Sequence, residues 1–213
     1  MTIRLPKVLA STDDAAALQV LERYYRVPLT KTGRLRSGAL WDTWDPSGTR
    51  ERDVGVFTSD DLVAVTFLSV EVSPDGADIV LRERRDEFAE LLAAVGPDRD
   101  LADEADEMTS RSPARQLETA LRTVPSIGRT VASKLIARKR PRLYPIYDRV
   151  VGEALGTKQA HLEPIRQALR HNDGQLQARL VGLRERAELP DAVPALRVLD
   201  VLAWMQLKAP ASD

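Results

Sequence analysis

The segment from Leu121 to Ile136 constrains the fold more than any other part of the chain. Its apolar residues fall on two helical stretches separated by a four-residue turn, and the small Ala132 stands where two helices must pack closely. Gly128 ends the turn and permits a tight backbone path close to a ligand. We therefore expect a helical hairpin whose second helix begins after Gly128. The apolar positions are Leu121, Val124, Ile127, Val131, Leu135 and Ile136.

The start of that second helix favours an anion. Unpaired backbone amides and the helix dipole attract negative charge at a helix N-terminus, and phosphate is the natural anion there. The residues from Arg129 to Arg142 include six bases and no acid, whereas six acids stand against one base between Pro97 and Glu107. The net charge of −1 therefore hides a local basic block. Such a block binds phosphates in some proteins, but more often it is only a solvated helix face.

The periodicity of the whole chain predicts an all-α fold. A helix is expected after Ser11 as N-cap, and another opens at Thr58 with Asp61 in a capping-box arrangement. Residues 27–56 lack clear periodicity and are expected to form a long loop. The helices predicted from the pattern are 12–26, the segment after Thr58, 76–95 with a break near Arg84, 113–124, 129–139, a short helix from Asp148 to Gly156, 160–171, 174–188 and 194–208.

The length suits a single globular unit over residues 1–213, built as a two-lobed helical fold. Residues 1–96 would supply N-terminal helices and the loop that carries two tryptophans. Residues 112–156 would supply the hairpin and an active-site segment, and residues 157–213 would form C-terminal helices packing on the N-terminal lobe. A cleft is expected between the lobes.

The amino-acid composition excludes several kinds of metal site and cross-link. The chain has no cysteine, which excludes disulfides, thiolate zinc sites and a Cys-ligated iron–sulfur cluster. Its two histidines are isolated in sequence, so we expect no metal site and no cofactor. No apolar run reaches the roughly 18 residues of a membrane span, and the first residues lack a secretory signal. The expectation is a cytoplasmic protein, away from membranes, and a monomer.

The hairpin residues resemble a known motif. The helix-hairpin-helix signature reads apolar-x-x-apolar-Pro-Gly-apolar-Gly-x-x-x-Ala, and Ser126 stands here at its first glycine. The resemblance implies a helix-hairpin-helix element over residues 121–148 that binds DNA. The residues that would contact the DNA backbone are Ser126, Ile127, Gly128, Arg129, Thr130 and Lys134. Relatives often hold an alkali cation on the carbonyls of such a hairpin, so the resemblance also admits one here.

Over residues 112–156 the chain is similar to the DNA glycosylase superfamily that carries this hairpin. Members place a catalytic aspartate at the start of the helix that follows, and Asp148 in the segment Tyr-Pro-Ile-Tyr-Asp matches it. Where members also cleave the strand, a lysine precedes that aspartate by eighteen residues; Thr130 stands at that position. Threonine cannot form a Schiff base. The resemblance therefore implies a monofunctional enzyme that removes a damaged or modified base, with Lys134 meeting phosphate or solvent.

Such an enzyme must stack the extruded base on a flat surface. Tyr144 and Tyr147 flank the active-site turn, and Trp41 and Trp44 lie in the long loop; these four are the expected pocket wall or wedge. Asp148 could equally serve only as an N-cap. Two alternatives to a glycosylase thus stay open: a non-catalytic module that recognises DNA or a DNA structure, and a helical protein whose hairpin serves packing or a protein partner.

A longer resemblance concerns the segments FTSDDLVAVTFLSV and KLIARKRPRLYPIYDRVV. They look like an uncharacterised family common in actinobacteria, a domain of unknown function numbered 6308. This resemblance places the protein in a family without implying an activity.

Overall fold

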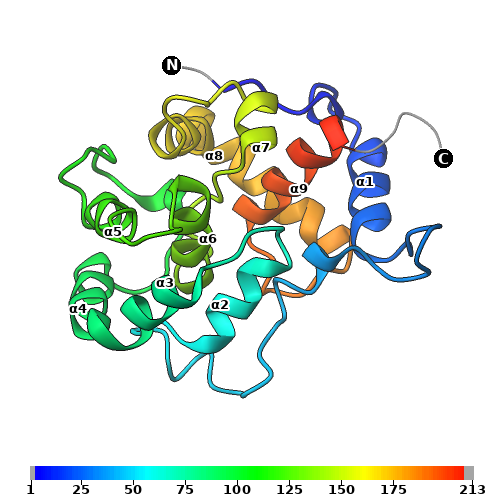
Figure 1. Ribbon diagram of the computed structural model, residues 1–213. Coiled ribbons are helices and arrows are strands. Elements are labelled where there is room, and N and C mark those ends of the chain that lie inside the picture. Colours follow the sequence, from blue (N-terminus) through cyan, green and yellow to red (C-terminus); the bar gives the residue numbers. More distant parts are fainter. Residues whose placement is uncertain (1–2, 209–213) are drawn as a thin grey trace.

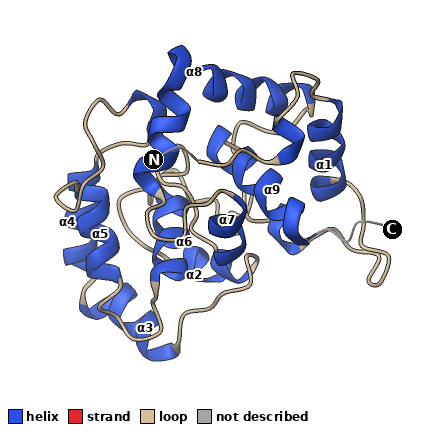
Figure 2. Ribbon diagram, turned by 90° about the horizontal axis from the view of Figure 1, so that it is seen from above, coloured by secondary structure: helices blue, strands red, loops and turns tan. Residues whose placement is uncertain are grey.

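The computed structural model describes residues 3–208, and every regular element in that range is helical, which confirms the all-α prediction (Figures 1 and 2). Predictions that extend to residues 1–2 and 209–213 lie outside the described residues. No helix in the described range is long and apolar enough to cross a membrane. The α-helices are α1 (Ala15–Tyr25), α2 (Ser59–Thr66), α3 (Pro74–Asp78), α4 (Arg85–Val95), α5 (Pro113–Leu121), α6 (Arg129–Lys139), α7 (Arg149–Ala154), α8 (Leu162–Arg186) and α9 (Ala195–Lys208).

The helix contacts divide into two groups. Helix α9 packs against α1, α7 and α8, while α6 packs against α2 and α5, and α5 also packs against α4. Figure 1 shows α9 beside α1, with α4 and α5 on the far side of the molecule. Helix α7 follows α6 in sequence yet packs on α9, so the turn that precedes α7 joins the two groups.

Most helix starts follow the capping residues. Thr58 and Asp61 form the expected capping box at α2, and proline at the first position opens α5. The expected N-cap of α1 was wrong, because the helix begins after Asp14. The Ser11 side chain instead accepts a hydrogen bond from the Asp13 backbone within a turn ahead of the helix.

Two breaks in the helices lie where the sequence pattern predicts them, near Arg84 and between residues 171 and 174. A π-helical turn, η3 (Ile79–Glu83), separates α3 from α4, and Arg84 leaves the helical region at φ −113°. Helix α8 combines the two helices expected around residues 160–188, but it is kinked where they were expected to separate. Its residues 172–174 have left-handed backbone angles, with φ between 50° and 77°.

The basic block of α6 lies inside the molecule rather than on its surface. Lys134, Arg138, Lys139 and Arg140 are each no more than 5% exposed. The alternative of a solvated helix face was therefore wrong for these four residues. Buried charges require partners, and partners far away in the sequence are present.

Backbone carbonyls of the long loop supply many of those partners. Arg138 donates to the carbonyl oxygens of Trp41, at 2.8 Å, and Trp44. Lys139 donates to the Asp53 carbonyl at 3.0 Å and pairs with the carboxylate of Asp61 at 2.6 Å. Loop 27–56 has no helix longer than the 3-10 turn η2 (Ser37–Ala39). Side-chain hydrogen bonds from the cations of α6 therefore satisfy backbone carbonyls of this loop, which has little regular secondary structure of its own.

Candidate functional site

A pocket of about 650 Å³ lies between the two groups of helices. Its walls come from α1, from residues 29–38, from the end of α2, from α6 and from α9, together with the residue that precedes α7. The volume falls within the range of about 300–1,000 Å³ that is usual for small-molecule sites. The charged residues on its wall are Lys31, Arg36, Lys134, Asp148, Arg197, Asp200 and Lys208.

Asp148 faces this pocket from a fixed position. It is the N-cap of α7, and its Oδ1 accepts a hydrogen bond from the Val150 backbone N–H at 2.8 Å. Its Oδ2 lies 3.6 Å from Nζ of Lys134, and a quarter of the side chain is exposed. The capping bond holds one oxygen while the other faces a cation. Capping and a chemical role are thus geometrically compatible.

Lys134 occupies a different place from the one expected. Its side chain is 2% exposed, and Nζ donates to the carbonyl oxygen of Leu68 at 2.8 Å. Burial lowers the pKa of this ammonium, and the nearby Asp148 carboxylate opposes that shift. A side chain so enclosed does not reach a phosphate on the outer surface. Lys134 is instead the counter-ion of Asp148 on the pocket wall.

A second buried ionic group, Arg197 and Asp200, also lines this pocket. Arg197 pairs with Asp42 at 3.2 Å and with Asp200, and it donates to the hydroxyl of Tyr24 at 2.9 Å. Burial raises the pKa of the Asp200 carboxyl, and the Arg197 guanidinium opposes the shift. Gly38 is required beside this group, because a Cβ at that position would fall 2.1 Å from the Tyr24 hydroxyl oxygen. Arg197 thus connects the first helix, the loop and the last helix at the wall of the pocket.

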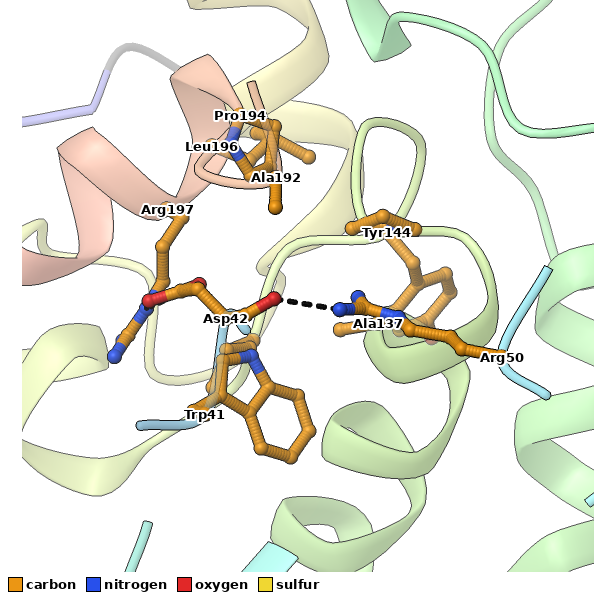
Figure 3. Close-up of a pocket in the computed structure, with 11 residues that line it drawn as sticks. Trp41, Asp42, Arg50, Ala137, Tyr144, Ala192, Pro194, Leu196 and Arg197 are labelled. Atoms are coloured by element: carbon orange, nitrogen blue, oxygen red, sulfur yellow. Dashed lines mark hydrogen bonds and ion pairs between the residues drawn. The ribbon is translucent and has the colours of Figure 1, made fainter. Parts of the chain in front are cut away.

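Two of the four expected wall aromatics lie elsewhere, at a smaller cavity shown in Figure 3. Trp41 and Tyr144 are each 3% exposed and line a space of about 10 Å³, which holds at most one water molecule. Asp42 lies beside them, and its backbone carbonyl accepts a hydrogen bond from Arg50. The Tyr144 hydroxyl donates to Glu118 at 2.7 Å. Both rings are core side chains.

The other two aromatics are also absent from the wall of the Asp148 pocket. Trp44 packs edge-on against Phe67, with ring centroids 4.9 Å apart. Tyr147 lies beneath the guanidinium of Arg129, whose central carbon is 3.7 Å from the ring centroid. The aromatic residues that do line the pocket are Tyr24, Phe67 and Trp204. The sequence pattern did not single them out, because at helical spacing they are indistinguishable from core residues.

The turn between α5 and α6 has a left-handed residue where the hairpin signature has glycine, but it does not depend on Gly128 for its conformation. Ser126 has a left-handed backbone, with φ 67°, the conformation that a glycine would adopt most easily. Its Oγ accepts a hydrogen bond from the Ser73 backbone at 2.9 Å, which ties the turn to α3. Gly128 is the exposed N-cap of α6, but its φ of −81° shows that the turn does not need glycine there for conformational reasons.

The remaining hairpin residues divide between core and surface. Ile127 is 2% exposed and belongs to the hydrophobic core. Arg129 and Thr130 are half-buried at the first turn of α6, and Arg129 donates to the carbonyl of Lys158 at 2.7 Å. Of the residues expected to contact DNA, Ser126 and Gly128 are exposed, whereas Ile127 and Lys134 are buried.

His161 braces the segment that leads to Asp148. It is buried, and its Nε2 donates to the Ile146 carbonyl at 2.9 Å while its Nδ1 accepts from the Thr157 hydroxyl at 2.8 Å. Burial lowers the pKa of His161 from 6.5 to about 4, so the imidazole is neutral near pH 7 and its two nitrogens make these hydrogen bonds as one donor and one acceptor.

Acidification should therefore weaken the fold through His161. The unfolded chain takes up a proton near pH 6.5 and the folded chain only near pH 4, so stability is full above pH 6.5 and falls as the pH drops through that window. The total loss is about 3 kcal/mol. Urea midpoints measured between pH 7.5 and 4 should fall more steeply for the parent than for His161→Gln. The exposed His171→Gln is the matched control, and equal slopes for all three proteins would contradict the assignment.

Taken together, the structure defines an all-helical protein with an aspartate–lysine pair on the wall of a pocket. Comparison of families identifies it further: residues 17–207 match the Family of unknown function (DUF6308), and the chain belongs to that family. No curated protein and no solved structure was found to match it.

Proposed function

We propose that this protein is a monofunctional, DNA glycosylase-like enzyme that hydrolyses the N-glycosidic bond of a damaged or modified base. The position of Asp148 carries the proposal, because a carboxylate fixed by a helix cap faces a pocket of about 650 Å³. The proposal also draws on the sequence-based expectation that residues 112–156 resemble helix-hairpin-helix glycosylases, in which Asp148 would correspond to the catalytic aspartate.

The proposed chemistry uses the charge of Asp148. As the C1′–N bond breaks, its electron pair leaves with the base and positive charge develops on the sugar. A carboxylate beneath the sugar stabilises that charge and orients water for attack at C1′. The new C–O bond forms from water, and the proton that water loses balances the charge on the departing base. Val150 holds one oxygen of Asp148 in place, so little reorganisation is needed during the reaction.

Lys134 has a positioning role in this proposal. Its ammonium is held between the Leu68 carbonyl and the carboxylate of Asp148, where it orients the second carboxylate oxygen. Thr130 supplies no amine, so we propose that the product is an abasic site in an intact strand. Borohydride treatment during the reaction should therefore trap no covalent protein–DNA adduct.

The helix-hairpin-helix interpretation supports DNA as the macromolecule. The hairpin turn adopts a left-handed angle at Ser126, where the signature has glycine, and α6 begins at Gly128. Helix α6 also carries Lys134, so a phosphate bound at the start of α6 would lie on the same helix as a pocket residue.

A non-catalytic DNA-binding module is the second candidate. One observation favours it: the ion pair with Lys134 at 3.6 Å lessens the negative charge that Asp148 offers to a substrate. In that case Asp148 would serve α7 as an N-cap and Lys134 as a counter-ion, and the pocket would accept an extruded base without cleaving it.

Base release separates these candidates. Duplexes that each contain one damaged or modified base would be incubated with the protein, heated in alkali to cleave abasic sites, and resolved by length. The enzyme hypothesis predicts release from at least one duplex, dependent on Asp148 and absent from the unmodified control. Binding without release from any member of a broad panel would support the non-catalytic module. Absence of salt-dependent binding to any duplex would contradict both.

A further inference from the structure

Residues 27–36 form an exposed loop on the outer side of the pocket. The backbone N–H groups of Gly33 and Thr32 donate to the Leu29 carbonyl, at 2.8 and 3.1 Å, and the Leu29 N–H donates to the Arg34 carbonyl at 2.8 Å. Gly33 has a φ of 64°, which closes the turn. Figure 1 shows this blue segment projecting beyond α1, on the opposite side of the molecule from α4 and α5. The loop is thus locally ordered, yet it projects into solvent.

The side chains of residues 27–36 make one edge of the pocket positively charged. It contains Lys31, Arg34 and Arg36 and no acid. Lys31 and Arg36 line the pocket that Asp148 faces, and Arg34 is exposed beside them. Within residues 3–208, the side chains of Lys31 and Arg34 have no carboxylate within ion-pair distance. These two bases therefore contrast with Lys139 of α6, which is paired and buried.

Apolar side chains share this exposed surface. Val27 is 45% exposed, Leu29 36% and Leu35 42%, and Leu29 also lines the pocket. Such a surface suits a ligand with both anionic and apolar parts, and a polynucleotide offers phosphates beside the flat faces of its bases.

We propose that residues 27–36 form a contact element for the DNA backbone, in which Lys31 and Arg34 bind phosphates flanking the nucleotide whose base enters the pocket. This inference rests on the proposed function and assigns the phosphate contacts mainly to this loop rather than to the side chains of α6. An anionic membrane could also attract cations and leucines. DNA fits better, because Lys31 and Arg36 line the pocket itself, so a phosphate bound there would lie next to a base inside the pocket, whereas attraction to a membrane would not involve the pocket.

The test compares two variants with the same loss of charge. Lys31→Ala/Arg34→Ala removes the proposed contacts, and Arg85→Ala/Arg111→Ala removes two exposed arginines from the side that carries α4 and α5. Fluorescence anisotropy with a labelled duplex gives the Kd at several salt concentrations. We expect the loop variant to lose roughly tenfold or more in affinity. Its salt slope should fall by about two, since each phosphate contact contributes about 0.9. The control should keep the parent's slope, and all three proteins should melt at the same temperature.

Further outcomes separate the inference from the function. If the loop variant binds duplex as tightly as the parent while base release persists, the loop contact is wrong and the enzyme proposal stands. If binding depends on the loop but no base is released, the contact stands and the enzyme proposal fails. Preferential, loop-dependent binding to phosphatidylserine vesicles would overturn the inference in favour of a membrane. Failure of the parent to bind duplex DNA would overturn both proposals.

Discussion

Asp148→Asn is expected to slow base release about a hundred- to a thousandfold, the usual effect of losing a preorganised electrostatic partner in a transition state. Asparagine keeps an acceptor for the Val150 N–H, so the cap of α7 is retained. Only the negative charge is removed. Single-turnover release from the best duplex of the panel measures the rate, and anisotropy should show that affinity for DNA is retained.

Two further variants separate chemistry from folding. Asp148→Ala also loses the cap and should be less stable than Asp148→Asn by about 1 kcal/mol. Either change removes the carboxylate nearest to the buried Lys134 and leaves its ammonium with the Leu68 carbonyl and the more general attraction of Asp200. Adding Lys134→Met to Asp148→Asn should therefore recover stability without recovering activity. Full activity of Asp148→Asn would exclude Asp148 as the catalytic group, even if the protein proved to be a glycosylase.

The local elements could be predicted because their signals are local. Proline at the start of α5, the capping pair of Thr58 and Asp61, and Asp148 ahead of α7 each act within one helical turn. Such residues satisfy backbone groups that have no partner inside the helix, so they mark helix ends irrespective of the tertiary fold. Ser11 misled the prediction because its hydroxyl bonds within a preceding turn instead.

The partners of the α6 cations could not be predicted from such local signals. Arg138 bonds to the Trp41 carbonyl ninety-seven positions away, and Lys134 bonds to the Leu68 carbonyl sixty-six positions away. A run of bases in sequence has the same composition whether it faces solvent or a loop that provides carbonyl oxygens. The aromatic lining of the pocket could not be predicted for a related reason, since Tyr24 and Trp204 meet there only because α1 packs on α9.

Asp61 has a central position among these buried charges. Its side chain caps α2 by accepting from the Thr58 N–H at 2.8 Å, and it faces two cations of α6. Lys139 Nζ lies 2.6 Å from one oxygen and Arg138 Nε 3.5 Å from the other, with all three side chains no more than 3% exposed. Because water cannot reach these cations freely, the carboxylate is their main source of compensating charge.

Asp61→Asn is consequently expected to destabilise the fold by about 3–5 kcal/mol, the usual cost of leaving a buried charge without its partner. Asparagine can still accept the capping bond, so the loss reports on charge rather than on the cap. The melting temperature should fall by roughly 10 °C, whereas Asp86→Asn on the exposed first turn of α4 should change stability by less than about 0.5 kcal/mol. Adding Lys139→Met should restore part of the loss, because it removes one of the two uncompensated cations. A melting temperature for Asp61→Asn within a degree or two of the parent would mean that the loop carbonyls alone compensate these cations.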